Sequence, residues 1–322
     1  MTHKIILDTD PGIDDAMAIL FAEAHPAIDL LAITTVFGNA TIENGTHNAL
    51  WLKQKYAMKA DVAQGAAAPL LRDPVGPTTV VHGPTGFGDV QAGEVSLSAD
   101  PRPAWQYIVE TVKAHPGEIT LVTIGPLTNL ALALQAAPEI AGLVREVVVM
   151  GGAFGVNGHR GNVTPYAEAN IHDDPEAADV VFTADWPVVI IGLDVTQQSV
   201  FSGAYLDALR DEAGEPGRFL WDVSRFYLRF YSARIGMEGC HVHDPSAIAY
   251  VIDPSLFTLR EGPVRVITQG PAIGHTLQKF DGNSHPHDEW AACPAQRVGV
   301  AVRDQALLAL YRDTLIAWGK GR

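Results

Sequence analysis

The sequence predicts an α/β protein with an open, mostly parallel central sheet and helices on both of its faces. Three observations lead to this fold class. Short β-rich apolar runs alternate with longer helical patterns along much of the chain. Apolar residues make up 47% of the 322 residues, enough for a sizeable core. Composition shows no obvious break, and Gly and Pro are spread rather than clustered, so we expect a single domain over residues 1–322.

The N-terminal part of the chain begins this alternation. Lys4–Asp8 (KIILD) is a short apolar run that predicts a buried strand, and Ala16–Ala24 (AMAILFAEA) predicts a helix. Leu30–Val36 is the next predicted strand, and Glu43–Lys55 is the next helix. Strands and helices that alternate in this order predict a mostly parallel sheet covered on both faces.

The middle of the chain continues the pattern. Ile119–Ile124 predicts a strand that is followed by a helix over Thr128–Ala136, and Val147–Met150 and Val188–Leu193 predict two further strands. In folds of this kind, ligands bind outside the carboxyl ends of the strands. The residues directly after each strand are therefore the first candidates for a functional site.

Charge and cysteine content argue against several classes of protein. The formal net charge of −15 argues against a basic face for nucleic acid. Cys240 and Cys293 have no CxxC spacing, which suits a reducing cytosol and argues against a disulfide scaffold or a thiolate metal site. No apolar signal core precedes the first strand, and no uncharged apolar run is long enough to span a bilayer. We expect a cytoplasmic protein without nucleic-acid or membrane partners.

Four carboxylates gather where the first strand ends. Asp8, Asp10, Asp14 and Asp15 lie within eight residues, and Pro11-Gly12 forces a tight turn that lets them converge. Helix capping and the helix dipole explain one or two of these acids. Converging carboxylates repel one another unless a cation or shared protons intervene. A hard divalent cation is the simplest remedy, and all-oxygen ligation favours Ca²⁺ or Mg²⁺.

Three later segments offer further polar groups. Residues 241–245 (HVHDP) place a histidine beside an aspartate that could complete a metal site, although such pairs are more often structural. Residues 161–170 (GNVTPYAEAN) carry side chains that suit a polyhydroxylated ligand such as ribose, and ordinary turn chemistry explains them equally well. Residues 125–129 (GPLTN) could turn a backbone carbonyl toward the site, or Thr128 could cap the following helix.

Five segments match blocks of one known family in the same order. They are Asp8–Leu20 (DTDPGIDDAMAIL), Phe37–Asn39 (FGN), residues 125–134 (GPLTNLALAL), residues 161–170 (GNVTPYAEAN) and residues 242–245 (VHDP). On these segments the chain resembles the inosine–uridine-preferring nucleoside hydrolases, over residues 1 to about 257. The resemblance implies an enzyme of nucleoside salvage that uses water to cut the N-glycosidic bond of a ribonucleoside. It also suggests a homodimer or homotetramer.

The resemblance implies one bound Ca²⁺ ion. Its ligands would be the carboxylates of Asp10, Asp15 and Asp244 and the backbone carbonyl of Thr128. Ribose hydroxyls and water would complete the six to eight oxygens that calcium takes. Calcium lowers the pKa of bound water only modestly, so a nearby base is still needed, and Asp10 is the best candidate.

The resemblance also implies where the ribose would be held. Asp14, Asn162, Glu168 and Asn170 match the residues that hold the ribose hydroxyls. Asn39 would lie by the metal and the attacking water. These assignments predict a site at the carboxyl ends of several different strands.

Aromatic and histidine side chains are expected at the leaving base. His243 matches the family's candidate acid, and His82 matches a second histidine near the base, on a Gly-rich segment that could act as a lid. The helix predicted at Phe226–Ile235 carries several aromatic residues, a pattern that is more often core. Tyr231 is the position on this helix that we expect to face the base.

Three positions depart from the family pattern. Ala169 stands where the family usually has Phe, which removes an apolar wall beside the ribose. Phe87 replaces the usual Leu in the lid motif; we expect it to affect packing, although it would sit close to where a base would lie. Residues 274–276 (GHT) replace the usual Gly-Met-Thr, and we expect them to affect packing.

Two other functions fit parts of the sequence. A haloacid-dehalogenase-like phosphatase also begins with a strand that ends in DxD, and its nucleophile would be Asp8 with Asp10 beside it. The residues after Asp10 do not match that signature. A nucleoside-binding protein without catalysis is the second alternative, and the intact Asp10, His243 and Asp244 argue against it.

Overall fold

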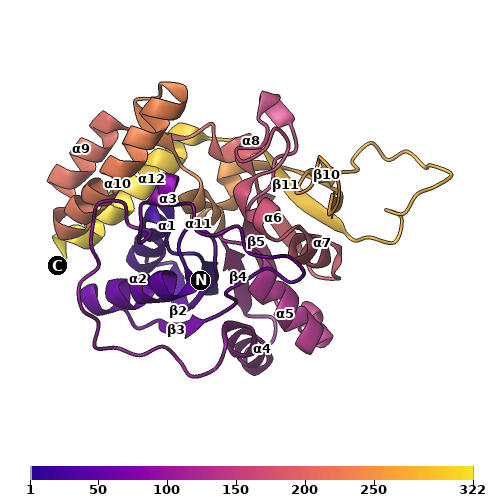
Figure 1. Ribbon diagram of the computed structural model, residues 1–322, viewed down its shortest axis with the longest axis horizontal. Coiled ribbons are helices and arrows are strands. Elements are labelled where there is room, and N and C mark those ends of the chain that lie inside the picture. The colour runs from indigo at the N-terminus through magenta and orange to yellow at the C-terminus, as the bar shows by residue number, and fades with distance from the viewer. Residues whose placement is uncertain (1, 322) are drawn as a thin grey trace.

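The computed structural model describes residues 2–321 and is built around one nine-stranded sheet (Figure 1). From edge to edge the strands are β10 (Thr276–Gln278), β9 (Phe257–Val266), β11 (Ala295–Val302), β6 (Val188–Ile191), β5 (Glu146–Met150), β4 (Ile119–Thr123), β1 (His3–Thr9), β2 (Ile28–Thr35) and β3 (Asp61–Gln64). All pairings from β11 to β3 are parallel, and only those of β9 with β10 and β11 are antiparallel. The predicted open, mostly parallel α/β fold is confirmed.

Helices cover both faces of the sheet because the strands are apolar on both faces. Ile5 and Leu7 belong to the core on one face, while Ile6 between them belongs to the core on the other. The first core is closed by α1 (Ile13–Ala24), α2 (Ile42–Lys55), α9 (Gly203–Glu212), α10 (Gly214–Ile235), α11 (Asp244–Ile252) and α12 (Asp304–Lys320). The second is closed by α4 (Ala104–Ala114), α5 (Thr128–Ala136) and α7 (Pro175–Thr183).

Several element boundaries differ from the sequence prediction. Helix α1 begins at Ile13 rather than Ala16, because acidic residues are favourable in the first turn of a helix. The strand predicted to reach Leu193 ends at Ile191, and Leu193 instead begins the short helix α8 (Leu193–Thr196). The aromatic helix predicted from Phe226 is the second half of the longer α10.

Short elements complete the carboxyl edge of the parallel strands. Helices α3 (Thr79–His82) and α6 (Ala169–Asp173) carry the predicted site residues His82 and Asn170. The hairpin of β7 (Val200–Ser202) with β8 (Gly239–His241) ends two residues before His243. The chain between β10 and β11 projects from the body of the molecule (Figure 1). Between residues 2 and 321, no helix has the length and apolar character needed to cross a membrane.

Candidate active site

A cavity of about 330 Å³ opens at the carboxyl edge of the parallel strands. It has the size and position of a small-molecule site in an open α/β fold. Most of the side chains singled out from the sequence line it: Asp14, Asn39, His82, Asn162, Glu168, Asn170, Tyr231, His243 and Asp244. Side chains far apart in the sequence therefore meet at this cavity.

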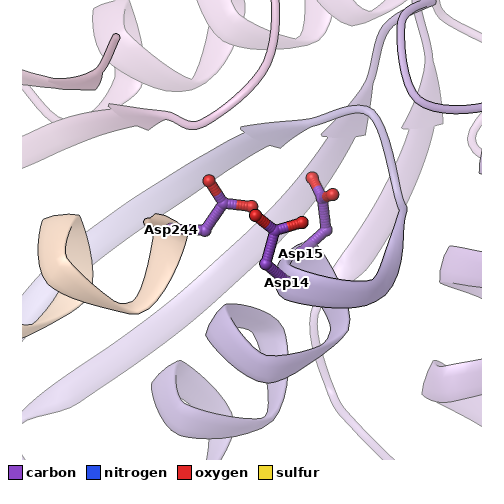
Figure 2. A group of neighbouring side chains, drawn as sticks. All are labelled: Asp14, Asp15 and Asp244. Atoms are coloured by element: carbon purple, nitrogen blue, oxygen red, sulfur yellow. The ribbon is translucent and has the colours of Figure 1, made fainter. Parts of the chain in front are cut away.

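Three buried aspartates form the acidic end of the cavity. Asp14 and Asp15 begin α1 and Asp244 begins α11, and one carboxylate oxygen from each lies within 4.8 Å of the others (Figure 2). Oxygens that share one Ca²⁺ lie about 2.3–2.6 Å from it, so two of them are at most about 5 Å apart. The observed spacing is therefore compatible with a single calcium ion.

Asp10 lies beside this cluster and is joined to it by Asn39. The backbone N–H of Asn39 donates to Asp10 Oδ2 at 2.7 Å, and its side-chain Nδ2 donates to Asp15 Oδ2 at 2.9 Å. A Cβ at Gly38 would lie 2.1 Å from Asp10 Oδ2, and one at Gly125 would lie 2.8 Å from Oδ1. Glycine at both positions is therefore what lets the backbone approach this carboxylate so closely.

The buried carboxylates repel one another, and a bound cation would relieve this repulsion. Burial raises the pKa of Asp10 and of Asp244 well above the ordinary aspartate range, and neighbouring carboxylates raise both further. Burial also raises the pKa of Asp14 to about 6. Asp10 Oδ1 and Asp14 Oδ1 are buried without a hydrogen-bond partner. A divalent cation would supply both the missing charge and the missing partner.

No protein side chain supplies that charge in the described part of the chain. The basic group found close to the cluster is His82, whose Nδ1 lies 3.8 Å from Asp14 Oδ1. Burial lowers the pKa of His82 to about 4, so its ring is neutral near pH 7. His82 Nδ1 also accepts a hydrogen bond from the backbone N–H of Ile13 at 3.2 Å, which fixes the ring beside the cavity.

The backbone ligand predicted for the metal, Thr128, does not line the cavity. It is the first residue of α5, so helix geometry directs its carbonyl along the axis toward the next turn. Its hydroxyl donates to Asp174 at 2.6 Å, and it does not line the cavity. Ile124, at the end of β4 and next to Gly125, does line the cavity. We therefore expect the backbone carbonyl of Ile124, rather than that of Thr128, to face the metal.

The wall expected to hold ribose is built around helix α6. Glu168 caps this helix, with its carboxylate accepting from the backbone N–H groups of Asn170 and Ile171. Asn170 Nδ2 donates to the carbonyls of Ile124 at 2.9 Å and Met150 at 3.1 Å. Asn170 therefore ties the ends of β4 and β5 together. Burial raises the pKa of Glu168 to about 7.

A chain of hydrogen bonds crosses the opposite wall. The Thr196 hydroxyl lies 2.8 Å from His243 Nδ1, and the Tyr231 hydroxyl lies 2.9 Å from His243 Nε2. Tyr231 meets the Tyr227 hydroxyl at 3.5 Å, and Tyr227 donates to Asp14 Oδ2 at 3.1 Å. The structure thus connects the predicted acid to the acidic cluster through two tyrosines.

Sequence reasoning did not select Tyr227 or Thr196 for the site. Tyr227 lies one helical turn before Tyr231, so the same α10 face carries both, and this spacing was the available signal. Thr196 ends the short α8, which the sequence prediction had assigned in part to a strand, and no motif marks it.

Two of the three departures from the family pattern lie outside the cavity. Phe87 packs against the rings of Trp51 and Phe219, in line with the expected effect on packing, but it is fully buried and does not line the cavity near a base. Thr276 accepts from Ala153 N–H at 2.9 Å, and His275 packs on the Tyr166 ring. Ala169 alone lines the cavity.

The phosphatase alternative needs an accessible Asp8, and the structure does not provide one. Asp8 is buried and does not line the cavity. Its Oδ2 accepts hydrogen bonds from Thr34 at 2.5 Å and from Asn129 at 2.8 Å. Asp8 therefore braces the ends of neighbouring strands and is not placed to attack a phosphate.

The fold and this cavity are those of a hydrolase with a mostly parallel α/β sheet, which holds a small polyhydroxylated substrate against acidic side chains. Comparison with known proteins gives the family. The family model described as inosine-uridine preferring nucleoside hydrolase matches residues 5–309. The chain belongs to this family, and it is an enzyme that hydrolyses the N-glycosidic bond of ribonucleosides. The match extends past residue 257, where the resemblance read from the sequence ended.

Individual relatives cover nearly the whole chain. A probable uridine nucleosidase 1 of Oryza sativa subsp. japonica is 41% identical over 316 residues, which are 98% of this chain and 97% of the relative. The pyrimidine-specific ribonucleoside hydrolase RihB of Escherichia coli is 41% identical over 276 residues, 85% of this chain and 87% of the relative. The solved structure of a plant nucleoside hydrolase has a TM-score of 0.95 at 36% identity, covering 98% of this chain and 100% of that one.

Proposed function

We propose that the enzyme cleaves ribonucleosides with one Ca²⁺ ion held by Asp10, Asp15, Asp244 and the backbone carbonyl of Ile124. The observation that carries this proposal is the buried group of Asp14, Asp15 and Asp244, whose oxygens lie within 4.8 Å of one another. Asp10 is joined to Asp15 through Asn39, and no Lys or Arg among the described residues forms an ion pair with these acids. All these ligands are oxygens, which a hard cation prefers, and calcium accepts their irregular arrangement better than the smaller magnesium.

When bound, the ion would hold ribose hydroxyls and the attacking water in place and offset the charge of the acids. The protein side chains divide the remaining work. Asp14 has a free, buried Oδ1 for a ribose hydroxyl, while its Oδ2 stays with Tyr227. Asn170 lies between the ends of β4 and β5, and Asn162 and Glu168 remain for the other end of the ribose.

The proposed reaction has three coordinated parts. Asp10 takes a proton from water, whose oxygen attacks C1′ as the bond from C1′ to the base nitrogen breaks. The surrounding carboxylates stabilise the positive charge that develops on the ribose. The leaving base takes a proton from His243, which first takes that proton up from solvent, because burial lowers the pKa of the ring and leaves it neutral at rest. Because His243 Nε2 is engaged by the Tyr231 hydroxyl and Tyr231 lines the cavity, the proposed proton path runs through that hydroxyl.

Uridine is the substrate to test first, because the relatives at about 41% identity include a probable uridine nucleosidase and a pyrimidine-specific hydrolase. The test is release of reducing sugar from a panel of purine and pyrimidine ribonucleosides. Ribose release from uridine is the expected result. Binding of uridine without release of ribose would show that the pocket has lost its chemistry.

We expect 2′-deoxyuridine to be cleaved about a hundredfold less efficiently than uridine. Asp14 Oδ1 is buried without a partner, and a hydrogen bond to a charged group is worth about 1.5–3 kcal/mol, or roughly 10- to 150-fold. The measurement is kcat/KM for the two nucleosides. Equal values would show that Asp14 and its neighbours do not hold the 2′-hydroxyl.

We expect Asp10→Asn to lower kcat for uridine by about a hundredfold or more, while the melting temperature of the metal-free variant stays close to that of the metal-free native enzyme. Asparagine is nearly isosteric and can still accept from Asn39 N–H, but it cannot take a proton from water. Asp29→Asn, on the exposed side of β2, is the control with the same change of charge. Activity within tenfold of native would remove Asp10 from the role of base.

A further inference from the structure

The wall of the cavity next to Glu168 is lined by small and exposed side chains. Ala169 lines the cavity and is only partly buried, and Gly161 lies beside it on the same wall. Asn162 is exposed, and Val163 is 48% exposed. A large side chain at position 169 would close this wall, and alanine leaves it open toward solvent.

This wall faces the 5′ end of the ribose, in an assignment that rests on the proposed function. The ion, Asp14 and Asn170 take the hydroxyls at the other end of the sugar. The 5′ carbon then points toward Asn162 and Glu168, on either side of the space that Ala169 leaves.

The polar groups of this wall have hydrogen-bond partners within the protein and do not need a 5′-hydroxyl to satisfy them. Glu168 Oε1 accepts from Asn170 N–H at 2.9 Å, and Oε2 accepts from Gly152 N–H at 2.9 Å and Ile171 N–H at 3.2 Å. These three bonds exist in the protein alone. Removing a 5′-hydroxyl therefore leaves the carboxylate of Glu168 satisfied.

The side chain of Asn162 also keeps its hydrogen-bond partners when the 5′-hydroxyl is absent. Its Oδ1 accepts from the backbone N–H of Ala169 at 3.1 Å, and the exposed side chain can exchange any further bond for one with water. The opposite end of the sugar differs, because Asp14 Oδ1 is buried and unpartnered. A site discriminates strongly only where loss of a substrate group leaves a buried polar group unpaired.

We propose that this enzyme also cleaves ribonucleosides whose 5′-hydroxyl is replaced by a small uncharged apolar group, such as an alkylthio group. Val163 and Ala169 offer such a group apolar contact at the open wall. A 5′-phosphate would instead be brought close to the carboxylate of Glu168, which repels it. The chemical class is therefore 5′-deoxy-5′-alkylthio ribonucleosides, and 5′-nucleotides are excluded.

The experiment compares uridine, 5′-deoxy-5′-methylthiouridine and uridine 5′-monophosphate on the native enzyme by release of free uracil. The methylthio nucleoside should have a kcat/KM within about tenfold of uridine, while the nucleotide should be cut at least about a hundredfold less well. Rejection of the methylthio compound by a factor of about 10³ would overturn the inference. Failure to cut uridine itself would instead overturn the proposed function, so the two failures are distinguishable.

The matched variants are Ala169→Phe and Ile235→Phe. Both add an aromatic ring at the cavity, but Ile235 lies on α10, away from the wall at α6, and is 58% exposed. Ala169→Phe should lower the ratio of methylthiouridine to uridine kcat/KM at least about tenfold, and Ile235→Phe should leave it unchanged. An equal ratio in both variants would contradict the inference. If Ala169→Phe does not fold, Ala169→Val should lower the ratio by a smaller factor.

Discussion

Removing divalent metal is expected to reduce ribose release to the uncatalysed background, and adding Ca²⁺ back is expected to restore it. Asp14, Asp15 and Asp244 bring their oxygens within 4.8 Å of one another in a buried setting, and Asp10 adds a fourth acid next to them. Without a cation these groups repel one another or take up protons, because burial and mutual repulsion raise the pKa of Asp10 and Asp244. A protonated Asp10 cannot act as a base.

Stability gives a readout of the metal that does not depend on activity. A ligand that binds only the folded state raises the free energy of unfolding, by about 2.7 kcal/mol when its concentration is 100 times its Kd. Added Ca²⁺ should therefore raise the melting temperature of the chelated protein. Asp244→Asn should need more Ca²⁺ for the same rise, and the exposed control Asp29→Asn should match the native protein. Full activity in a verified metal-free preparation would contradict the calcium assignment.

The part of the site that could be predicted from sequence is the part where chain order and local geometry coincide. A strand that ends in Asp10, followed by a tight turn and a helix that begins near Asp14 and Asp15, fixes three acids within a few residues. Asp244 also begins a helix, α11, soon after β8 of the two-stranded hairpin, and residues 242–245 (VHDP) mark it in the sequence. These constraints are local, so the motif alone was sufficient.

What could not be predicted depends on contacts between distant elements. The choice between the carbonyls of Ile124 and Thr128 depends on where β4 ends and α5 begins, and boundaries are poorly determined by a pattern of residues. Phe87 lies in the core because it meets Trp51 and Phe219, whose positions depend on α2 and α10. The sequence of a glycine-rich segment does not indicate whether an aromatic ring in it packs in the core or lines the cavity.

The C-terminal strands show the same limit at the level of the fold. No element was predicted from the sequence beyond residue 257, yet β9, β10 and β11 extend the sheet by three strands. Strand β9 alternates buried and half-buried positions near its end, as an antiparallel strand near a sheet edge does. Such short alternating runs do not stand out among the buried, continuous apolar strands of the parallel region.

The sharpest test of the mechanism is His243→Ala, measured on two substrates. Uracil and hypoxanthine are poor leaving groups as anions, and help from a general acid is worth about 10² to 10⁴ in rate. A p-nitrophenyl riboside leaves as a stable phenolate and needs no proton. His243→Ala should therefore lose about 10² to 10⁴ in kcat on uridine or inosine and little on p-nitrophenyl riboside. Asp244→Ala should impair both substrates, because the metal site serves either reaction.

The hydrogen-bond chain adds a second arm to this test. Tyr231→Phe removes the hydroxyl that lies 2.9 Å from His243 Nε2 and should show the same selective loss on natural nucleosides. His241→Ala is the matched histidine control, since its ring lines the cavity 5.6 Å from His243 but forms no hydrogen bond with Tyr231 or His243 among those found in residues 2–321. An equal loss on both substrates in His243→Ala would make His243 a positioning residue. Selective loss in His241→Ala alone would place the proton donor two residues earlier, on β8, where a ring edge-on to Tyr231 at 5.3 Å could reach the base from the same wall.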